Sequence, residues 1–378
     1  MLRQVELRDL VGLQRGQSYK GTLLGEPGPV LLGLGTINRN GGFRAGNLKT
    51  YGGESSPRTL LGPGDLYVSL KDVTHAADLL GAVARVPDSV QVGRLTQDTI
   101  GLDVDDAAVN RSYLYWALQT PNYRSYCKAR GTGTTNLDLS RDDFLAFKIS
   151  LPGRPQQRAI AEVLGALDNK IAANSRVATT AKMLQAAEFM RLMSGAGVPS
   201  TIRNVLTFEY GKPLLAQNRT TGNVDVFGSG GIVGSHNEAL ASGPGVVVGR
   251  KGTAGAVHWA PEDYYPIDTT FFVVSSDIEI YSMIFCYHLL KSVRLSEQNS
   301  DSAVPGLNRN DAHAIKIRLP DKESTRRFTL TAMPQANLAA QCDRESLVLA
   351  ATRDALLPQL MSGKLRVKDV EKSLAGVL

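Results

Sequence analysis

The sequence is poor in cysteine and in aromatic residues, and it has no long apolar run. Its three cysteines, Cys127, Cys286 and Cys342, lie far apart and form no Cys-x-x-Cys pair, which argues against a disulfide framework or a zinc site. Aromatic residues make up 6% of the chain, so a base-stacking platform for single-stranded nucleic acid is not indicated. No apolar run approaches the ~20 residues that cross a bilayer, and the first residues contain no apolar signal region. These features predict a cytoplasmic protein with buried free thiols.

Motifs of catalysis are also missing. Residues 249–255 follow a predicted strand, but they lack the Gly-Lys-Ser/Thr order of a phosphate-binding loop. The pair Gly33 and Gly35 has no third glycine, which argues against a dinucleotide fingerprint. The Asn/Asp-Pro-Pro-Tyr/Phe motif of adenine methyltransferases is absent, and the five histidines show no metal-ligand spacing. The sequence therefore predicts no catalytic residue, no metal site and no cofactor in this chain.

The chain does have length, apolar content and positive charge. Its 378 residues suit two or three domains, and 43% of them are hydrophobic, enough to bury real cores. A formal net charge of +6 fits nucleic-acid binding without proving it.

One long stretch occurs twice. Ile-Ser-Leu-Pro at residues 149–152 is matched by Ile-Arg-Leu-Pro at 317–320, and Leu-Met-Ser-Gly at 192–195 recurs at 360–363, so one offset of 168 residues relates both pairs. Near the start of each copy, residues 7–16 correspond to 202–211 with an offset of 195, so the first copy has 27 additional residues in its interior. A constant offset indicates one structural unit that was duplicated.

Both interiors have the pattern of β-rich globules. Short apolar runs separated by Gly, Pro and Asn predict strands at 30–35, 66–70 and 98–102 in the first copy, and at 246–248 and 268–274 in the second. A helix is expected after the strands of each copy, near 113–118 and 281–290.

The repeated stretch itself has a helical pattern from residue 155 to residue 192. Ile160, Leu164, Leu167 and Ile171 follow 4-3-4 spacing, which is typical of a coiled-coil seam. Asn174, Ala178 and Ala181 continue this stripe, and their small size favours close approach of a partner helix. The alternative is a lone core helix of one domain.

The second copy departs from this pattern at Pro334, which corresponds to Ala166. A proline removes a backbone hydrogen bond, so we expect the C-terminal helix to start late or to bend there. Beyond it, Cys342, Leu349 and Leu356 recur every seven residues, which predicts that the seam resumes.

Two similar seams predict an α+β protein with two mixed α/β globules joined by two long antiparallel helices and related by a pseudo-twofold repeat. The expected parts are a first globule at 1–152, a central helix at 153–197, a second globule at 198–320 and a C-terminal helix at 321–378. Because duplex DNA repeats its major groove every ~34 Å, such a rigid spacer could place two readers on one face of the duplex.

These motifs resemble the specificity (S) subunit of type I restriction–modification systems. The resemblance is carried by residues 149–152, by Gln156-Gln157-Arg158-Ala159-Ile160-Ala161-Glu162-Val163-Leu164, by Leu167-Asp168-Asn169-Lys170-Ile171 and by the closing residues 356–365. Pro63-Gly64-Asp65-Leu66 and Asp268-Thr269-Thr270 also resemble parts of its target-recognition domains. The second copy has Gln335-Ala336 where the first has Leu167-Asp168.

The resemblance implies a non-catalytic, cytoplasmic prokaryotic subunit that reads double-stranded DNA. Each globule would read one half of a bipartite site, and the helices would set the spacer and bind two copies of a modification subunit. Those partners would carry S-adenosylmethionine and methylate adenine N6 after flipping the base. A motor–nuclease restriction subunit is a further partner of the family.

Basic and polar side chains near Gly-containing loops are the candidates for DNA contact. Such side chains hold phosphates, and Arg, Asn and Gln can pair with base edges. Each is alternatively an ordinary solvated charge. The candidates are Tyr19, Lys20, Arg39, Arg44, Lys71, Arg130 and Thr132 in the first copy and Lys212, Arg219, Arg250 and Lys251 in the second. Arg141 and Arg309 occupy equivalent positions, which indicates a structural or phosphate-positioning role.

The loop at 131–136 has its counterpart near 299–302. Two other functions compete with DNA reading. One is an interaction scaffold derived from such a subunit, and the other is a self-sufficient methyltransferase or nuclease, which the missing motifs disfavour.

Overall fold

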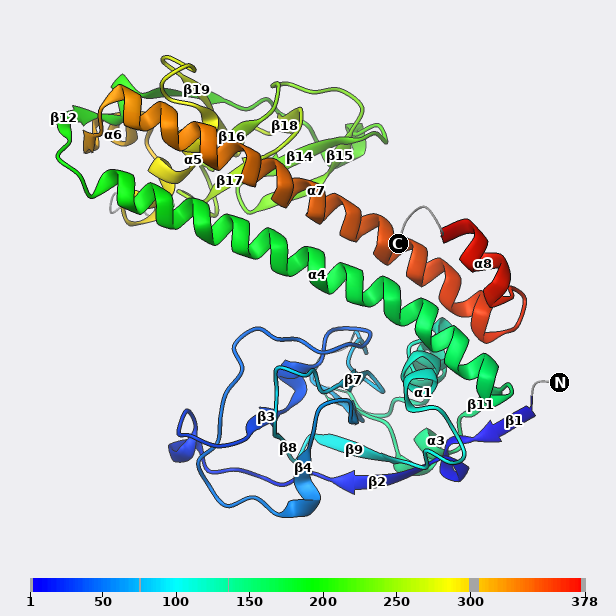
Figure 1. Cartoon of the computed structure of the whole chain (residues 1–378). Coiled ribbons are helices and arrows are strands. Elements are labelled where there is room, and N and C mark those ends of the chain that lie inside the picture. The colour runs from blue at the N-terminus through cyan, green and yellow to red at the C-terminus, as the bar shows by residue number, and fades with distance from the viewer. Residues whose placement is uncertain (1–2, 75, 135, 299–305, 375–378) are drawn as a thin grey trace. The chain divides into compact units, whose positions relative to one another are not determined.

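The computed structural model describes residues 3–74, 76–134, 136–298 and 306–374 (Figure 1). The chain divides into two compact units. Unit 1 comprises residues 1–171 and 348–378, and unit 2 comprises residues 172–347. Within the described residues, no helix is both long enough and apolar enough to cross a membrane.

The β-rich part of unit 1, called head 1 here, contains a four-stranded sheet in the order β2-β9-β5-β7 and a three-stranded sheet in the order β3-β8-β4. Strand β1 pairs with β11, and β6 pairs with β10. The strand bounds are β1 Arg3–Glu6, β2 Val11–Arg15, β3 Val30–Leu32, β4 Leu60–Leu61, β5 Leu66–Ser69, β6 Lys71–Asp72, β7 Val83–Arg85, β8 Gly93–Leu95, β9 Thr99–Val104, β10 Leu137–Asp138 and β11 Lys148–Leu151. The helices are α1 Arg111–Ala117, α2 Pro121–Arg130 and α3 Arg141–Leu145.

The β-rich part of unit 2, head 2, repeats the four-stranded sheet of head 1, whereas its three-stranded sheet has a different strand order. Its four-stranded sheet has the order β13-β19-β16-β17, its three-stranded sheet has the order β15-β14-β18, and β12 pairs with β20. The strand bounds are β12 Val198–Thr201, β13 Leu206–Tyr210, β14 Val224–Gly228, β15 Gly231–His236, β16 Gly245–Gly249, β17 Val257–Ala260, β18 Tyr264–Pro266, β19 Thr270–Ser275 and β20 Lys316–Leu319. The helices are α5 Met283–Ser292 and α6 Arg309–Ala314.

The two four-stranded sheets correspond strand by strand. Strands β2, β9, β5 and β7 of unit 1 take the places of β13, β19, β16 and β17 of unit 2, and all neighbouring pairs are antiparallel. The α+β fold class and the internal duplication predicted from the sequence are therefore confirmed.

A glycine directly follows the first strand of each four-stranded sheet, β2 and β13, for the same steric reason. A Cβ at Gly16 would collide with the backbone carbonyl oxygen of Thr96, and a Cβ at Gly211 would collide with that of Ile267. The offset of 195 between these glycines thus reflects one repeated close approach of two backbone segments.

Two long helices, α4 (Arg154–Met193) and α7 (Lys322–Met361), pack side by side (Figure 1). In unit 2, α4 residues Asn174, Lys182 and Glu188 hydrogen-bond to α7 residues Glu345, Asp343 and Thr331, and this descending order makes the pair antiparallel. The predicted antiparallel helix pair is confirmed. A short helix, α8 (Val367–Leu374), follows α7 and buries Val370 in the core of unit 1.

Pro334 does not delay or interrupt α7, contrary to the late start that we considered from the sequence. One α-helix runs through it from Lys322. Pro334 and Leu330, whose carbonyl loses its usual amide partner, are both exposed. Water can therefore hydrate that carbonyl, which reduces the cost of the missing hydrogen bond.

The strand predicted at 30–35 is shorter than expected. Strand β3 ends at Leu32, and residues Leu34–Thr36 form a 3-10 turn. The amide and the hydroxyl of Thr36 both donate to the carbonyl of Gly33, at 3.0 and 2.8 Å, which closes this turn. The prediction of buried free thiols is confirmed, because Cys127, Cys286 and Cys342 are all buried and unpaired with one another.

Candidate functional site

Head 1 has a cavity of about 440 Å³, called cavity 1, beside the turn after β2. Tyr19, Arg44 and Lys49 line it, together with Asp98 and the backbone of residues 33–36. The sequence analysis named Tyr19 and Arg44 but did not identify Lys49. The structure thus brings an aromatic ring and two cations from separate loops to one open cavity.

Arg94 holds the turn that carries Tyr19. This arginine is 2% exposed, and its two Nη atoms donate to the carbonyls of Gln17 and Ser18 at 3.3 and 2.9 Å. Its guanidinium carbon lies 4.7 Å from the centre of the Tyr51 ring, which in turn contacts the ring of Tyr19. Because a buried arginine fixes both the turn and the ring beneath it, Tyr19 is held in place at the edge of cavity 1.

The other candidates of head 1 lie outside this cavity. The ammonium of Lys71 is 3.5 Å from the carboxylate of Asp98, and the guanidinium of Arg39 is 4.0 Å from that of Asp78. Arg130 pairs with Asp143 at 3.7 Å and covers the ring of Tyr126.

The remaining two candidates of head 1, Lys20 and Thr132, make their contacts through backbone atoms. The amide of Lys20 donates weakly to Tyr51 at 3.4 Å, and Thr132 bridges to Asp138 through backbone hydrogen bonds of 2.8 and 2.9 Å. Of the loop pair considered from sequence, residues 135 and 299–302 lie outside the described residues.

Head 2 has a cavity of about 420 Å³, called cavity 2, at the ends of β13 and β16. Tyr210 belongs to its lining, and the guanidinium carbons of Arg250 and Arg309 lie 5.3 and 5.4 Å from the centre of the Tyr210 ring. Lys251, Asn308 and Asn310 complete the polar lining, and no acidic residue belongs to the described lining. The field in cavity 2 is therefore positive, which suits an anionic ligand.

The backbone of head 2 orients Arg250. Its Nε and one Nη donate to the carbonyl of Asp268 at 3.2 and 2.8 Å. A guanidinium held in this way loses little further freedom when it meets a ligand.

The other two candidates of head 2 differ in role. Arg219 donates to the carbonyl of Val233 at 2.6 Å and so braces the β14–β15 hairpin, whereas the side chain of Lys212 is exposed. Arg219 thus has a structural task that its position in the sequence did not reveal.

The predicted seam residues of unit 1 lie in its core. Ile160, Leu164, Leu167 and Leu349 are buried in one cluster that also contains head residues such as Trp116, and Ile171 and Leu356 pack against that cluster. In unit 2 the stripe continues through Ala178 and Ala181, which pack against Ala339 and Cys342 of α7.

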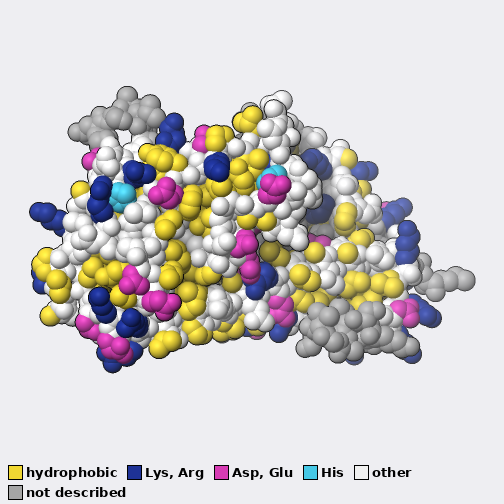
Figure 2. Space-filling model, turned by 90° about the horizontal axis from the view of Figure 1, so that it is seen from above, with side chains coloured by type: hydrophobic (Ala, Val, Ile, Leu, Met, Phe, Trp, Pro, Cys, Tyr) yellow, Lys and Arg dark blue, Asp and Glu magenta, His cyan; other side chains and the backbone are white. Residues whose placement is uncertain are grey.

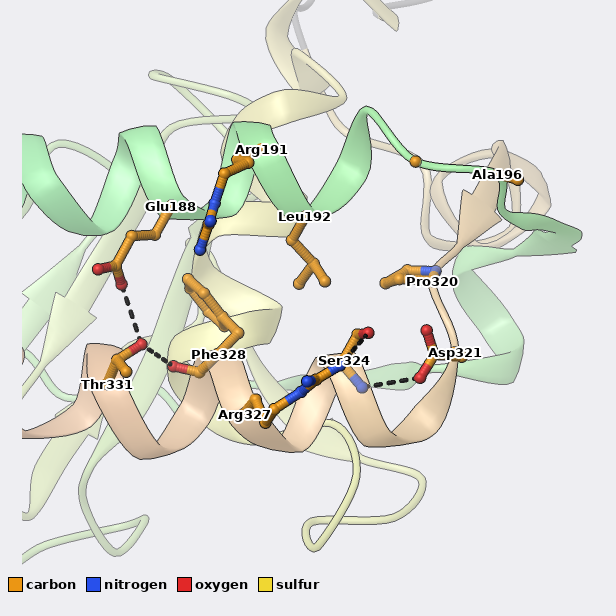
Figure 3. Close-up of a pocket in the computed structure, with 11 residues that line it drawn as sticks. Glu188, Arg191, Leu192, Ala196, Pro320, Asp321, Ser324, Arg327, Phe328 and Thr331 are labelled. Atoms are coloured by element: carbon orange, nitrogen blue, oxygen red, sulfur yellow. Dashed lines mark hydrogen bonds between the residues drawn. The ribbon is translucent and has the colours of Figure 1, made fainter.

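A third cavity, of about 590 Å³, lies in unit 2 between the end of α4 and the start of α7 (Figure 3). Its lining combines Leu192 and Phe328 with the charged side chains of Glu188, Arg191 and Arg327. Glu188 accepts a hydrogen bond from the Thr331 hydroxyl at 2.9 Å. Because charges of both signs line this cavity, it is less suited than cavity 2 to a phosphate.

The sequence analysis missed Lys49, Arg94 and Tyr210 as contributors to the two cavities. Lys49 and Arg94 belong to loop and strand positions without a motif. Only the packing of distant segments brings Lys49 to cavity 1 and Arg94 beneath the turn that carries Tyr19. Tyr210 could have been noticed, because it precedes the repeated glycine Gly211 directly.

Comparison with protein-family models gives no match, and comparison with curated protein sequences gives none either. Among solved structures, the chain is similar to the S subunit of a type I restriction–modification system from M. genitalium, with a TM-score of 0.70 and 18% identity over 96% of each chain.

Two further structures are less similar. One is a structure from work on complex assembly and conformational transition of the type I R-M system. It has a TM-score of 0.42 and 14% identity, and the match covers 96% of this chain and 98% of that one. The HsdS subunit from Thermoanaerobacter tengcongensis has a TM-score of 0.36 and 14% identity, covering 96% of this chain and 97% of that one. These two scores are too low to support an argument. The match to the M. genitalium structure shows that this chain has the fold of a type I S subunit, which confirms the resemblance noted in the motifs.

Proposed function

We propose that this chain is the non-catalytic, DNA-reading specificity subunit of a type I restriction–modification complex. Each head contacts one half of a bipartite site in double-stranded DNA, and the paired helices set the unread stretch between the half-sites. One observation supports this proposal most strongly. Both heads, with their duplicated four-stranded sheet, are part of the structural match to a solved S subunit, which has a TM-score of 0.70.

The two cavities support the DNA-reading part. Arg44 and Lys49 line cavity 1, and Arg250, Lys251 and Arg309 line cavity 2. Cations of this kind neutralise phosphates and release counterions, while Arg and Asn side chains can pair with base edges. The two cavities lie at different positions of their heads, but each gives its head cations that can meet DNA, which suits two half-sites better than one continuous site.

Exposed apolar side chains on the helices support the partner part. In unit 2, Met190 of α4 and Leu330 of α7 are 72% and 75% exposed, and Met183, Leu338 and Leu347 are also exposed. Figure 2 shows a face on which apolar side chains lie between charged ones. Such surfaces are typical of protein docking sites. In the proposal, two copies of a modification subunit dock on the helices, bind S-adenosylmethionine and methylate adenine N6, and a restriction subunit joins as a further partner.

A binding experiment tests the proposal. The chain is assembled with its modification partner, its site is selected from a random duplex library, and the protected bases are mapped by footprinting. We expect a bipartite site with two protected blocks and salt-sensitive affinity. One contiguous block, or no preference among sequences, contradicts the proposal.

A charge reversal separates DNA reading from the scaffold alternative. Arg250→Glu together with Lys251→Glu should lower DNA affinity at least roughly tenfold, because cavity 2 then repels phosphates. A scaffold that no longer reads DNA predicts no change. The matched control reverses two exposed cations of β20 that line neither cavity, Lys316→Glu and Arg318→Glu. The fluorescence of Trp259 in head 2, measured in a Trp116→Phe background, checks that the variant is folded.

A further inference from the structure

The register of the two heads pairs the residues of cavity 2 with residues of head 1. Strand partners Val248 and Phe271 correspond to Val68 and Ile100. The amide of Leu307 donates to the carbonyl of Arg250 at 2.9 Å, and the amide of Leu139 donates to the carbonyl of Leu70 at 2.8 Å. These matched bonds place Arg250 and Leu70 at the same point of the fold.

Two further positions follow from this register. Lys251 forms a bridge with Gly306, and Lys71 forms the equivalent pair with Asp138, so the two lysines correspond. Arg309 and Arg141 are each the first residue of the helix that follows, α6 and α3.

The equivalent positions fall into two classes. Both heads have Lys at the first position (Lys251 and Lys71) and Arg at the second (Arg309 and Arg141). By contrast, Arg250 of head 2 corresponds to Leu70 of head 1, and Tyr210, paired with Phe271, corresponds to Arg15, paired with Ile100. Thus a pair of cations is common to heads whose neighbouring side chains differ.

We propose that Lys251 and Arg309, with their equivalents Lys71 and Arg141, contact phosphates of the duplex and supply affinity without choosing its sequence, whereas Arg250 contributes to the sequence preference of head 2. This inference rests on the proposed function. Phosphates are the same in every half-site, so two heads that read different bases can keep the same phosphate contacts. Base contacts must differ between the heads, as the residues at the position of Arg250 do.

The exposure of three of these four cations agrees with this division. Lys251, Lys71 and Arg141 are exposed and can follow a phosphate, whereas Arg309 is half-buried and donates to the carbonyl of Phe208 at 3.4 Å. The pair of Lys71 with Asp98 is a surface ion pair with 51% and 34% exposed side chains, so a phosphate can compete with it. Arg250 is instead partly buried and fixed by two hydrogen bonds to the Asp268 carbonyl, which suits contact with one defined edge.

The test measures affinity as a function of salt for two duplexes of equal length, one with the selected site and one with that site scrambled. The assembled complex carries Lys251→Gln with Arg309→Gln, or Lys71→Gln with Arg141→Gln. Each pair should weaken binding to both duplexes by the same factor, roughly tenfold at moderate salt, and lower the salt slope by about 2. Arg250→Gln should reduce the preference between the duplexes, with a change in slope of no more than about 1.

A control variant and two different negative outcomes separate a failure of this inference from a failure of the proposed function. Lys316→Gln with Arg318→Gln removes the same charge from β20, outside both cavities and both long helices, and should leave the slope unchanged. The inference is overturned if the paired variants change the preference, or if they leave the salt slope at its original value. If instead the unmutated complex shows no sequence preference, the proposed function fails, while the change in salt slope still decides whether these cations contact phosphates.

Discussion

The side chains beside the contact of a head with its helices differ between the two units. In unit 1 an apolar cluster joins head 1 to the helices, and a group of charged side chains lies next to it. The guanidinium carbon of Arg85 lies 4.2 Å from the ring centre of Tyr115, and Arg353 of α7 donates to Asp168 of α4 at 2.6 Å. Burial lowers the pKa of Arg85, whereas Tyr115 and Asp168 counteract this effect.

In unit 2 the equivalent contact is aromatic. Trp259 replaces Arg85, and its ring centre lies 5.8 Å from that of Tyr287, the counterpart of Tyr115. Phe189 of α4 stacks on His288, whose Nε2 is 3.4 Å from Oε1 of Gln185. The same backbone topology therefore accommodates two different sets of side chains between head and helices, because each set fills the space in its own unit.

The largest expected effect breaks the aromatic contact. Phe189 is 3% exposed and its ring contacts Phe285, His288 and Phe328, so Phe189→Ala should cost unit 2 about 3–5 kcal/mol of unfolding free energy. The measurement is denaturant unfolding followed by Trp259 fluorescence in a Trp116→Phe background, since the chain has two tryptophans. Leu184→Ala, at a position 47% exposed on the same helix, is the control and should cost less than about 0.5 kcal/mol. Equal losses for the two variants contradict this account.

The second effect depends on pH. Burial, with a smaller contribution from Lys291, lowers the pKa of His288 from 6.5 to about 4. Between these values the unfolded chain binds a proton that folded unit 2 excludes, so its stability falls as the pH is lowered from about 6.5 towards 4. The total loss is roughly 3 kcal/mol from this histidine. Trp259-detected unfolding at several pH values measures it, and His288→Gln should flatten the profile in that window. An unchanged profile in the variant rules out this histidine as the cause.

The smallest effect tests the charged side chains beside the apolar contact of unit 1. Asp168→Asn removes the charge that Arg353 and Arg85 share, but Asp168 is 43% exposed, so water screens part of the loss. Unit 1 should lose about 1–2 kcal/mol, measured by Trp116 fluorescence in a Trp259→Phe background. Asp354→Asn removes another partner of Arg353 that is 65% exposed, and it should cost less than about 0.5 kcal/mol. A larger loss from Asp354→Asn than from Asp168→Asn contradicts a central role for Asp168.

Much of the architecture could be predicted from local patterns. The 4-3-4 spacing from Ile160 to Ile171, within the helical pattern of residues 155–192, placed α4 within one residue of its observed ends, Arg154 and Met193. Helical periodicity depends on neighbours along the chain, so it is visible without the fold. The effect of Pro334 was less predictable, because its cost depends on whether the unpaired carbonyl faces water.

The functional surfaces were less accessible to prediction. Lys49 and Arg44 meet Tyr19 only because the loops around β3 fold against the turn after β2. In the sequence, Arg130 and Arg219 were as good candidates for DNA contact as Arg250. In the structure, Arg130 forms an ion pair with Asp143 and covers the ring of Tyr126, and Arg219 hydrogen-bonds across a hairpin. Charge type is a property of the residue, whereas availability to a ligand is a property of its neighbours.

The sequence by itself determined the duplication, the two long helices and the β-rich character of both heads, because repeats and periodicities are recorded in residue order. Only the tertiary structure decided which cations share a cavity, which residues of the two heads are equivalent, and whether charged or aromatic side chains lie beside the apolar contact of a head with its helices. Those outcomes arise from contacts between segments far apart in the chain, where shape and burial select among side chains that residue order leaves equally eligible.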